Sequence, residues 1–236
     1  MRSAIIYGLS SCLLFASCLS GLAQADATFA DGLYGHAVGQ IARASELERR
    51  GKKKEAIAAY ELSGQLSEAA LSEAEQSGAM TDDDRPPDRY YECAIAYLHA
   101  GRLLARMSDQ VPRMDEDLRK AVLYLEMVEK IEAARAQRAN KPINPEVWRV
   151  RNAEGYACFL RGELAQARVH YRAVLEMNPT YHPAQQAIAK INELEQKQNE
   201  LFTPQGPTLH KERMSKAIHD VVDTLKLVKD IVSLGR

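Results

Sequence analysis

This sequence of 236 residues has few aromatic residues, few cysteines and no excess of charge of either sign. Lysine and arginine together number 31 against 32 acidic residues, which gives a formal net charge of −1. A dedicated nucleic-acid-binding domain normally carries a basic excess, so this balance argues against that class. Aromatic residues make up only 6% of the chain, whereas 46% of its residues are hydrophobic. Alanine and leucine supply most of the apolar residues, which favours helices over strands.

The sequence also lacks the short motifs of common catalytic and metal sites. It contains no H-E-x-x-H zinc motif, no P-loop and no G-x-S-x-G nucleophile motif. The six histidines form no metal-ligand pair with cysteine. We therefore expect no catalytic residue, no metal site, no cofactor and no enzymatic activity. A small enzyme on a helical scaffold is the alternative from another class.

The first 25 residues have the layout of a secretory signal peptide. Arg2 supplies the positive charge, and an uncharged apolar stretch follows to about Leu19. Ala23-Gln24-Ala25 is a small-x-small cleavage site. The apolar run is short of the roughly 20 residues that span a bilayer, so an uncleaved membrane anchor is the weaker alternative.

A second route of export is lipid attachment, because Phe15-Ala16-Ser17-Cys18 resembles a bacterial lipobox. We expect an exported protein of the periplasm or another part of a bacterial cell envelope. Contact with a membrane is expected only if Cys18 is lipidated, which would make the chain an outer-membrane lipoprotein.

Beyond residue 25, apolar residues recur at i, i+3, i+4 and i+7, which is typical of amphipathic helices. Clusters of proline, glycine and aspartate separate these stretches. No segment shows the period-two alternation of a half-buried strand. The pattern predicts an all-α chain with helices at about 33–50, 52–76, 88–107, 115–138, 146–161, 164–177, 183–200 and 209–233.

The helices come in pairs, and the clearest pair spans residues 148–179. Gly155 and Ala167 are small where its two helices meet, Gly162 suits the turn between them, and Pro179 would end the second helix. The full set of spaced positions is Gly155, Ala157, Gly162, Leu164, Ala167, Tyr171, Leu175 and Pro179. This spacing resembles the tetratricopeptide repeat (TPR).

Weaker copies of the same pattern precede this pair. One copy begins at Tyr90 and places Gly101 in the turn, but Ala121 of its second helix follows only after an insertion of about 15 residues. An earlier copy has Gly51 in its turn, and residues 182–200 resemble a capping helix. The resemblance implies an irregular TPR-like solenoid of helical hairpins over residues 26–200.

Cleavage after Ala25 would leave two cysteines, Cys93 and Cys158. An oxidising compartment permits a disulfide between them, and two buried thiols are the alternative. Because the resemblance places the two cysteines in the seams of different repeats, a bond between them is geometrically disfavoured.

A TPR-like stack implies a concave groove that holds an extended or helical peptide. Arg149, Asn152 and Lys190 resemble a polar clamp for a carboxylate or for backbone carbonyls. Tyr91, Tyr156 and Phe159 would pack against apolar side chains of a partner. Carried onto this chain, the groove positions are Tyr91, Ile95, Leu98, His99, Arg149, Asn152, Tyr156, Phe159, Gln186 and Lys190. The alternative is that these residues only cover the solenoid or meet the C-terminal helix.

After a linker at 201–208, residues 209–236 carry an apolar stripe with heptad spacing. The stripe consists of Met214, Ile218, Val221, Leu225, Val228 and Val232. It predicts an amphipathic helix that either folds back on the array, forms a homodimer or docks on a larger assembly.

Taken together, the resemblance implies a non-enzymatic adaptor that binds a protein or peptide partner. A lipid-anchored accessory subunit of an outer-membrane or secretion assembly is the alternative of the same class.

Overall fold

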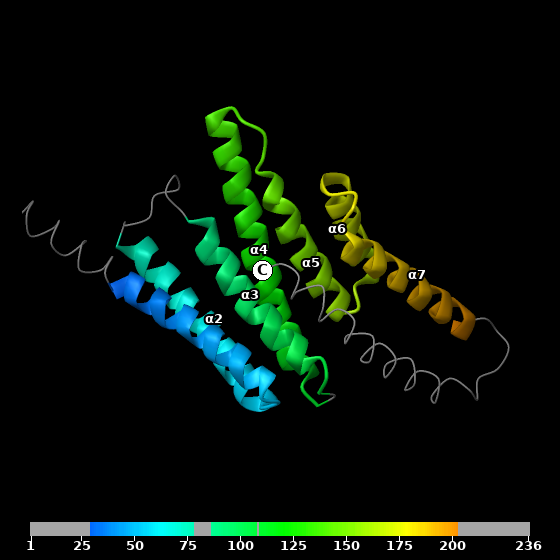
Figure 1. Ribbon diagram of the computed structural model, residues 1–236, viewed down its shortest axis with the longest axis horizontal. Coiled ribbons are helices and arrows are strands. Elements are labelled where there is room, and N and C mark those ends of the chain that lie inside the picture. Colours follow the sequence, from blue (N-terminus) through cyan, green and yellow to red (C-terminus); the bar gives the residue numbers. More distant parts are fainter. Residues whose placement is uncertain (1–28, 78–85, 108, 203–236) are drawn as a thin grey trace, which may run out of the picture.

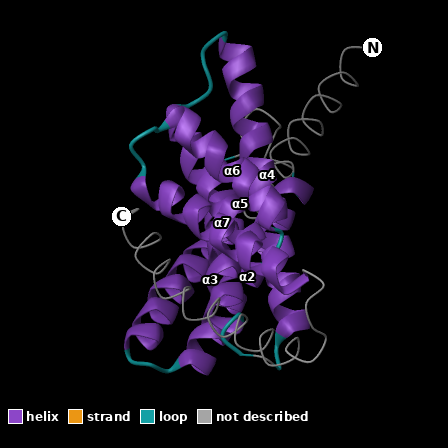
Figure 2. Ribbon diagram, turned by 90° about the vertical axis from the view of Figure 1, so that its right-hand side faces the viewer, coloured by secondary structure: helices purple, strands orange, loops and turns teal. Residues whose placement is uncertain are grey.

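The computed structural model describes residues 29–77, 86–107 and 109–202. The predicted signal peptide, Cys18 and the predicted C-terminal helix lie outside these residues. Within them the regular elements are helices and no strand is present (Figure 1; Figure 2). They are a first helix at 29–49, α2 (Lys53–Gln76), α3 (Pro87–Leu104), α4 (Val111–Ala139), the short 3-10 helix η1 (Pro145–Val147), α5 (Trp148–Leu160), α6 (Leu164–Met177) and α7 (His182–Phe202).

These boundaries confirm the all-α prediction and shift several helix ends. α4 begins at Val111 rather than at 115, because Pro112 is tolerated in the first turn of a helix, where its missing N–H has no partner to lose. α3 ends at Leu104 rather than at 107. The expected insertion between Gly101 and Ala121 is therefore shared by the last turn of α3, residues 105–110 and the first turns of α4.

The first helix and α3 run side by side in the same direction. Arg89 pairs with Asp31 at 2.5 Å, and Arg102 pairs with Glu48 at 2.6 Å. From the first contact to the second, the residue numbers increase on both helices, as they do in two parallel helices. α2 and α4 show the same relationship in a second layer, where Glu61 pairs with Arg113 and Glu68 with Lys120.

Consecutive helices, in contrast, are antiparallel. Asp115 at the start of α4 pairs with Arg161 just after α5, at 3.0 Å, whereas Glu129 farther along α4 pairs with Arg151 near the start of α5. The chain is therefore a stack of antiparallel hairpins, with the first helix, α3 and α5 in one layer and α2, α4 and α6 in the other (Figure 1). α7 packs on α6, where Arg168 pairs with Glu195.

Glycines have two distinct uses in this stack. Gly51 and Gly162 have φ angles of +76° and +79°, which confirms them as turn residues. Gly101 was predicted in a turn as well but lies inside α3, where a Cβ atom would come within 2.6 Å of Leu118 on α4. A Cβ atom on Gly155 would likewise lie 3.2 Å from the Tyr171 ring on α6, so these two glycines let neighbouring helices approach closely.

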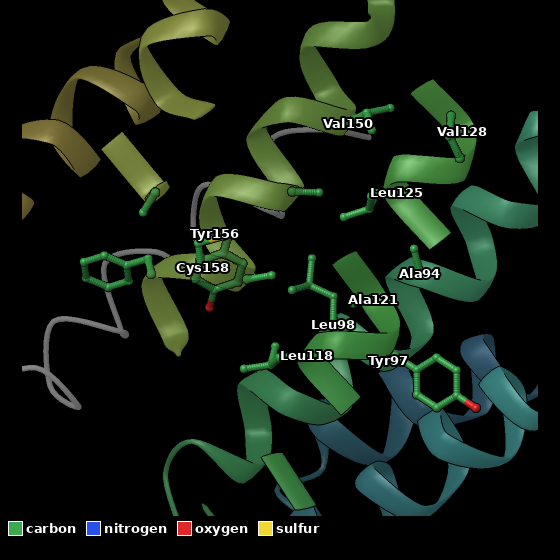
Figure 3. Close-up of a cluster of buried hydrophobic side chains, with 14 of the residues drawn as sticks. Ala94, Tyr97, Leu98, Leu118, Ala121, Leu125, Val128, Val150, Tyr156 and Cys158 are labelled. Carbon is green, nitrogen blue, oxygen red and sulfur yellow. The ribbon is translucent and has the colours of Figure 1, made fainter. Parts of the chain in front are cut away.

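The main core lies between α3, α4, α5, α6 and α7. Leu98, Leu118 and Leu125 meet at its centre (Figure 3). A smaller cluster joins the first helix and α2 to the far end of α3 around Tyr60 and Leu103. The hairpins are therefore held by continuous side-chain packing and not only by the ion pairs on their surface.

The two described cysteines are buried and neither forms a disulfide. The Cys93 thiol lies 3.7 Å from the Gly64 carbonyl oxygen, between α3 and α2. The Cys158 thiol lies 3.9 Å from Gln166 Oε1, between α5 and α6. The two thiols thus belong to different hairpin interfaces.

Candidate functional site

The predicted groove residues divide into core residues and surface residues. Leu98, Tyr156 and Phe159 are 3%, 1% and 4% exposed and belong to the main core. Tyr156 and Phe159 were expected to offer apolar surface to a partner. They cannot do so in this structure because α5 is the central helix of the main core and is buried on several faces from Val150 to Phe159.

His99 lies inside the stack as well. Its ring stacks on Tyr60 of α2, with the centroids 5.0 Å apart, and its Nδ1 is 3.3 Å from Arg102 Nη2. His99 therefore joins two hairpins. Tyr91 and Ile95 are half-buried against the main core, and Gln186 on α7 is exposed.

The two cations of the predicted polar clamp pair with glutamates three residues away in the sequence. Arg149 is exposed and pairs with Glu146 at 2.8 Å. Lys190 pairs with Glu193 at 2.9 Å, and Lys197 pairs with the other oxygen of the same carboxylate at 2.7 Å. Exposed ion pairs of this kind contribute little free energy, so a ligand can displace them. Asn152 is half-buried, and its Oδ1 has no hydrogen-bond partner within the described ranges.

An aromatic cluster (Tyr91, Trp148, Arg149 and Tyr181) gathers where α3, α5 and the α6–α7 turn meet. The rings of Trp148 and Tyr181 are 4.7 Å apart, and the Arg149 guanidinium lies 5.6 Å from the centre of the Trp148 ring. Burial raises the pKa of Tyr91, and the positive charge of Arg149 lowers it. Burial and then Tyr91 raise the pKa of Tyr181, whereas Arg149 lowers it.

Trp148 and Tyr181 were missed by the sequence analysis. Both lie at the ends of helices, where the repeat spacing assigns no role. The one available signal was that Trp148 is the single tryptophan of the chain.

Beside the aromatic cluster lies a pocket of about 170 Å³. Tyr91 and Arg149 belong to both the cluster and the pocket wall. Valines form its apolar surface, and carboxylates outnumber cations around it. The lining residues are Pro87, Asp88, Tyr91, Val128, Glu132, Asn144, Glu146, Val147, Arg149 and Val150.

A second polar group lies farther along α3. Burial raises the pKa of the Tyr156 hydroxyl, and the positive charges of Arg102 and Arg106 lower it, so both arginines lie near this hydroxyl. Several of their polar atoms are buried without a partner from the described residues. Such groups each cost about 1–3 kcal/mol of stability.

A buried ionic group joins α5 to α6. Glu154 is 1% exposed, and its Oε2 lies 2.9 Å from His170 Nδ1. Hydrogen bonding of the His170 ring to Cys158 and then to Glu154, which accept from it, raises the pKa of His170 to about 9, so the imidazole is charged at neutral pH. A thiol, an imidazole and a carboxylate can form a nucleophilic site, but the Cys158 side chain is 2% exposed and buried between helices. We interpret the group as a link within the hairpin.

The described part of the chain was searched for clustered metal ligands and for membrane-spanning helices. No group of three or more His, Cys, Asp or Glu side chains in these ranges is placed to hold a metal ion. No helix within the same ranges is both long and apolar enough to cross a bilayer. Comparisons with family models, with curated proteins and with solved structures give no match for this chain.

Proposed function

We propose that this chain is an exported, TPR-like adaptor that binds a protein or peptide partner and has no catalytic role. The observation that carries the proposal is the aromatic cluster, in which a tryptophan, two tyrosines and an arginine meet beside a pocket. Tryptophan, tyrosine and arginine dominate the binding energy of protein interfaces, and such anchors sit around pockets. In a chain with few aromatic residues, this concentration favours a binding surface.

The pocket chemistry indicates which side chain of the partner enters. Asp88, Glu132 and Glu146 bring three carboxylates, and Arg149 brings one positive charge that already pairs with Glu146. Val128 and Val150 give the pocket an apolar side. A lysine or arginine of the partner fits this arrangement, because its aliphatic stem covers the valines while its charge meets the carboxylates.

The cellular location of the adaptor rests on residues 1–25 alone. Mass spectrometry of the mature protein separates the two forms of export. Cleavage after Ala25 gives an unmodified chain, whereas processing at Cys18 adds the mass of a diacylglycerol and favours the lipid-anchored accessory subunit.

The adaptor proposal is tested by capture of partners from a cell-envelope extract with the full chain. Arg149→Ala and Trp148→Leu should each reduce capture, because they remove the exposed cation and the ring of the aromatic cluster. Val169→Ala is the matched control, since Val169 is 65% exposed on α6 in the other layer. Equal capture by the wild type and all three variants would contradict the proposal.

A further inference from the structure

Arg102, Arg106 and Tyr156 present polar atoms that the described part of the chain leaves without partners. Arg102 is 3% exposed, and its Nη2 pairs with Glu48 at 2.6 Å while its Nε has no hydrogen-bond partner there. The Nε and Nη2 atoms of Arg106 are buried and have no hydrogen-bond partner among the described residues. Tyr156 is 1% exposed, and its hydroxyl likewise has no hydrogen-bond partner among these residues.

The chemistry of these atoms points to an anion. Every one of them can donate a hydrogen bond. Glu48 balances one guanidinium, so the group retains one positive charge. A single carboxylate would neutralise that charge, and its two oxygens match the parallel N–H bonds of a guanidinium. Arg106 is only half-buried and gives the group its contact with the surface.

We propose that Arg102, Arg106 and Tyr156 form a binding site for one carboxylate of the peptide partner. This inference rests on the proposed adaptor function and adds a second contact to the pocket beside Tyr91. It differs from the polar clamp expected at Arg149 and Lys190, whose charges pair with Glu146 of η1 and Glu193 of α7.

The spacing of the two sites defines the partner further. Tyr91 and Arg102 both lie on α3, and the core residue Leu98 lies between them on that helix. Tyr91 and Arg102 are 11 positions apart, which corresponds to about 16 Å along a helix. An extended peptide covers that distance with about five residues. The partner segment therefore carries a basic side chain and an acidic side chain about five residues apart.

The test follows the arginine Nε–Hε signals of the full chain by NMR. The probes are N-acetylglutamate amide and, as the uncharged control, N-acetylglutamine amide. We expect the glutamate probe alone to shift the signals of Arg102 and Arg106. The proposal is overturned if neither signal shifts, or if both probes shift them equally.

Three variants of the full chain locate the binding. Arg106→Gln should weaken binding of the glutamate probe about tenfold, since it removes a charge-assisted hydrogen bond. Tyr156→Phe should also weaken it and, in the unbound protein, raise Tm by removing a buried unpartnered hydroxyl. Arg119→Gln is the control, because Arg119 is exposed on α4. An equal loss in Arg119→Gln, or an unchanged affinity in Arg106→Gln and Tyr156→Phe, overturns the proposal.

The result is separable from the adaptor proposal. Binding of the glutamate probe without Arg149-dependent capture of a partner would leave the carboxylate site standing and contradict the adaptor. Arg149-dependent capture without probe binding would support the adaptor and overturn the carboxylate site.

Discussion

The ring of Tyr97 on α3 occupies the space where a side chain on Gly64 of α2 would lie. A Cβ atom on Gly64 would be 2.5 Å from Tyr97 Cζ. Tyr97 is 1% exposed, and Lys120 lies 4.7 Å from the centre of its ring, so the ring has little room to move. The first two hairpins thus depend on a glycine for their spacing.

Gly64→Ala should therefore lower the free energy of unfolding by about 1–3 kcal/mol, the usual cost of overpacking a core. Gly39→Ala is the matched control in the first helix, where nothing lies within 4 Å of the added methyl group. That control should raise the free energy by about 0.5–1 kcal/mol, because alanine favours a helix. Urea denaturation measures both variants, and a Gly64→Ala protein as stable as the wild type would refute the close contact.

Gly162 tests the turn between α5 and α6. Its φ of +79° is unfavourable for other residues, although nothing lies within 4 Å of an added Cβ. Gly162→Ala should cost about 1–2 kcal/mol, all of it from the backbone conformation. Gly162→Asn should cost less, because asparagine tolerates this region better. Thermal denaturation of the two variants should show that order, and the reverse order would contradict the turn.

Asp117 on α4 should make the protein less stable as pH rises. Burial, followed by repulsion from Glu61, raises the pKa of its carboxyl from 3.8 to about 7. Because the folded state holds the proton more tightly, stability falls between about pH 4 and pH 7. Asp117→Asn should remove this slope and stabilise the protein at pH 7 by on the order of 1 kcal/mol. Urea denaturation at both pH values gives the slope, and a slope unchanged in the variant would contradict this assignment.

His170 should make the protein lose stability at a higher pH than Asp117 does. Its pKa is raised from 6.5 to about 9 by Cys158 and Glu154, so its contribution to stability is complete below pH 6.5. That contribution should disappear as pH rises through 9. His170→Gln should abolish this loss, whereas His182→Gln, at an exposed position of α7, should keep it. Thermal denaturation between pH 6 and pH 10 compares the variants, and identical profiles for both would show that His170 is not responsible.

Helix periodicity and turn chemistry predicted most of the fold, because both are local. The pattern located the helices from α2 to α7, and Gly51 and Gly162 have the positive φ that a turn requires. Gly101 was misplaced because glycine serves a turn and a close helix contact equally well. Only the packing of Leu118 against it decides between the two.

The candidate site was less predictable because it depends on which helix faces are covered. The repeat spacing placed Tyr156 and Phe159 in a groove, but in this stack α5 is enclosed and both are core residues. Spacing found Tyr91 and Arg149, which do line a pocket. The polar group of Arg102 and Arg106 was missed, since the sequence does not show which arginines end up buried without a full set of partners.

Photo-crosslinking in living cells tests most directly whether a partner binds beside the aromatic cluster. A photoreactive amino acid replaces Asn144 of the pocket wall or Gln186 of α7, or Leu123 or Val169 in the other layer, all exposed positions. The account predicts a crosslinked partner from Asn144 and Gln186 and none from Leu123 and Val169. Crosslinks from Leu123 and Val169 alone, or no crosslink from any of the four positions, would contradict it.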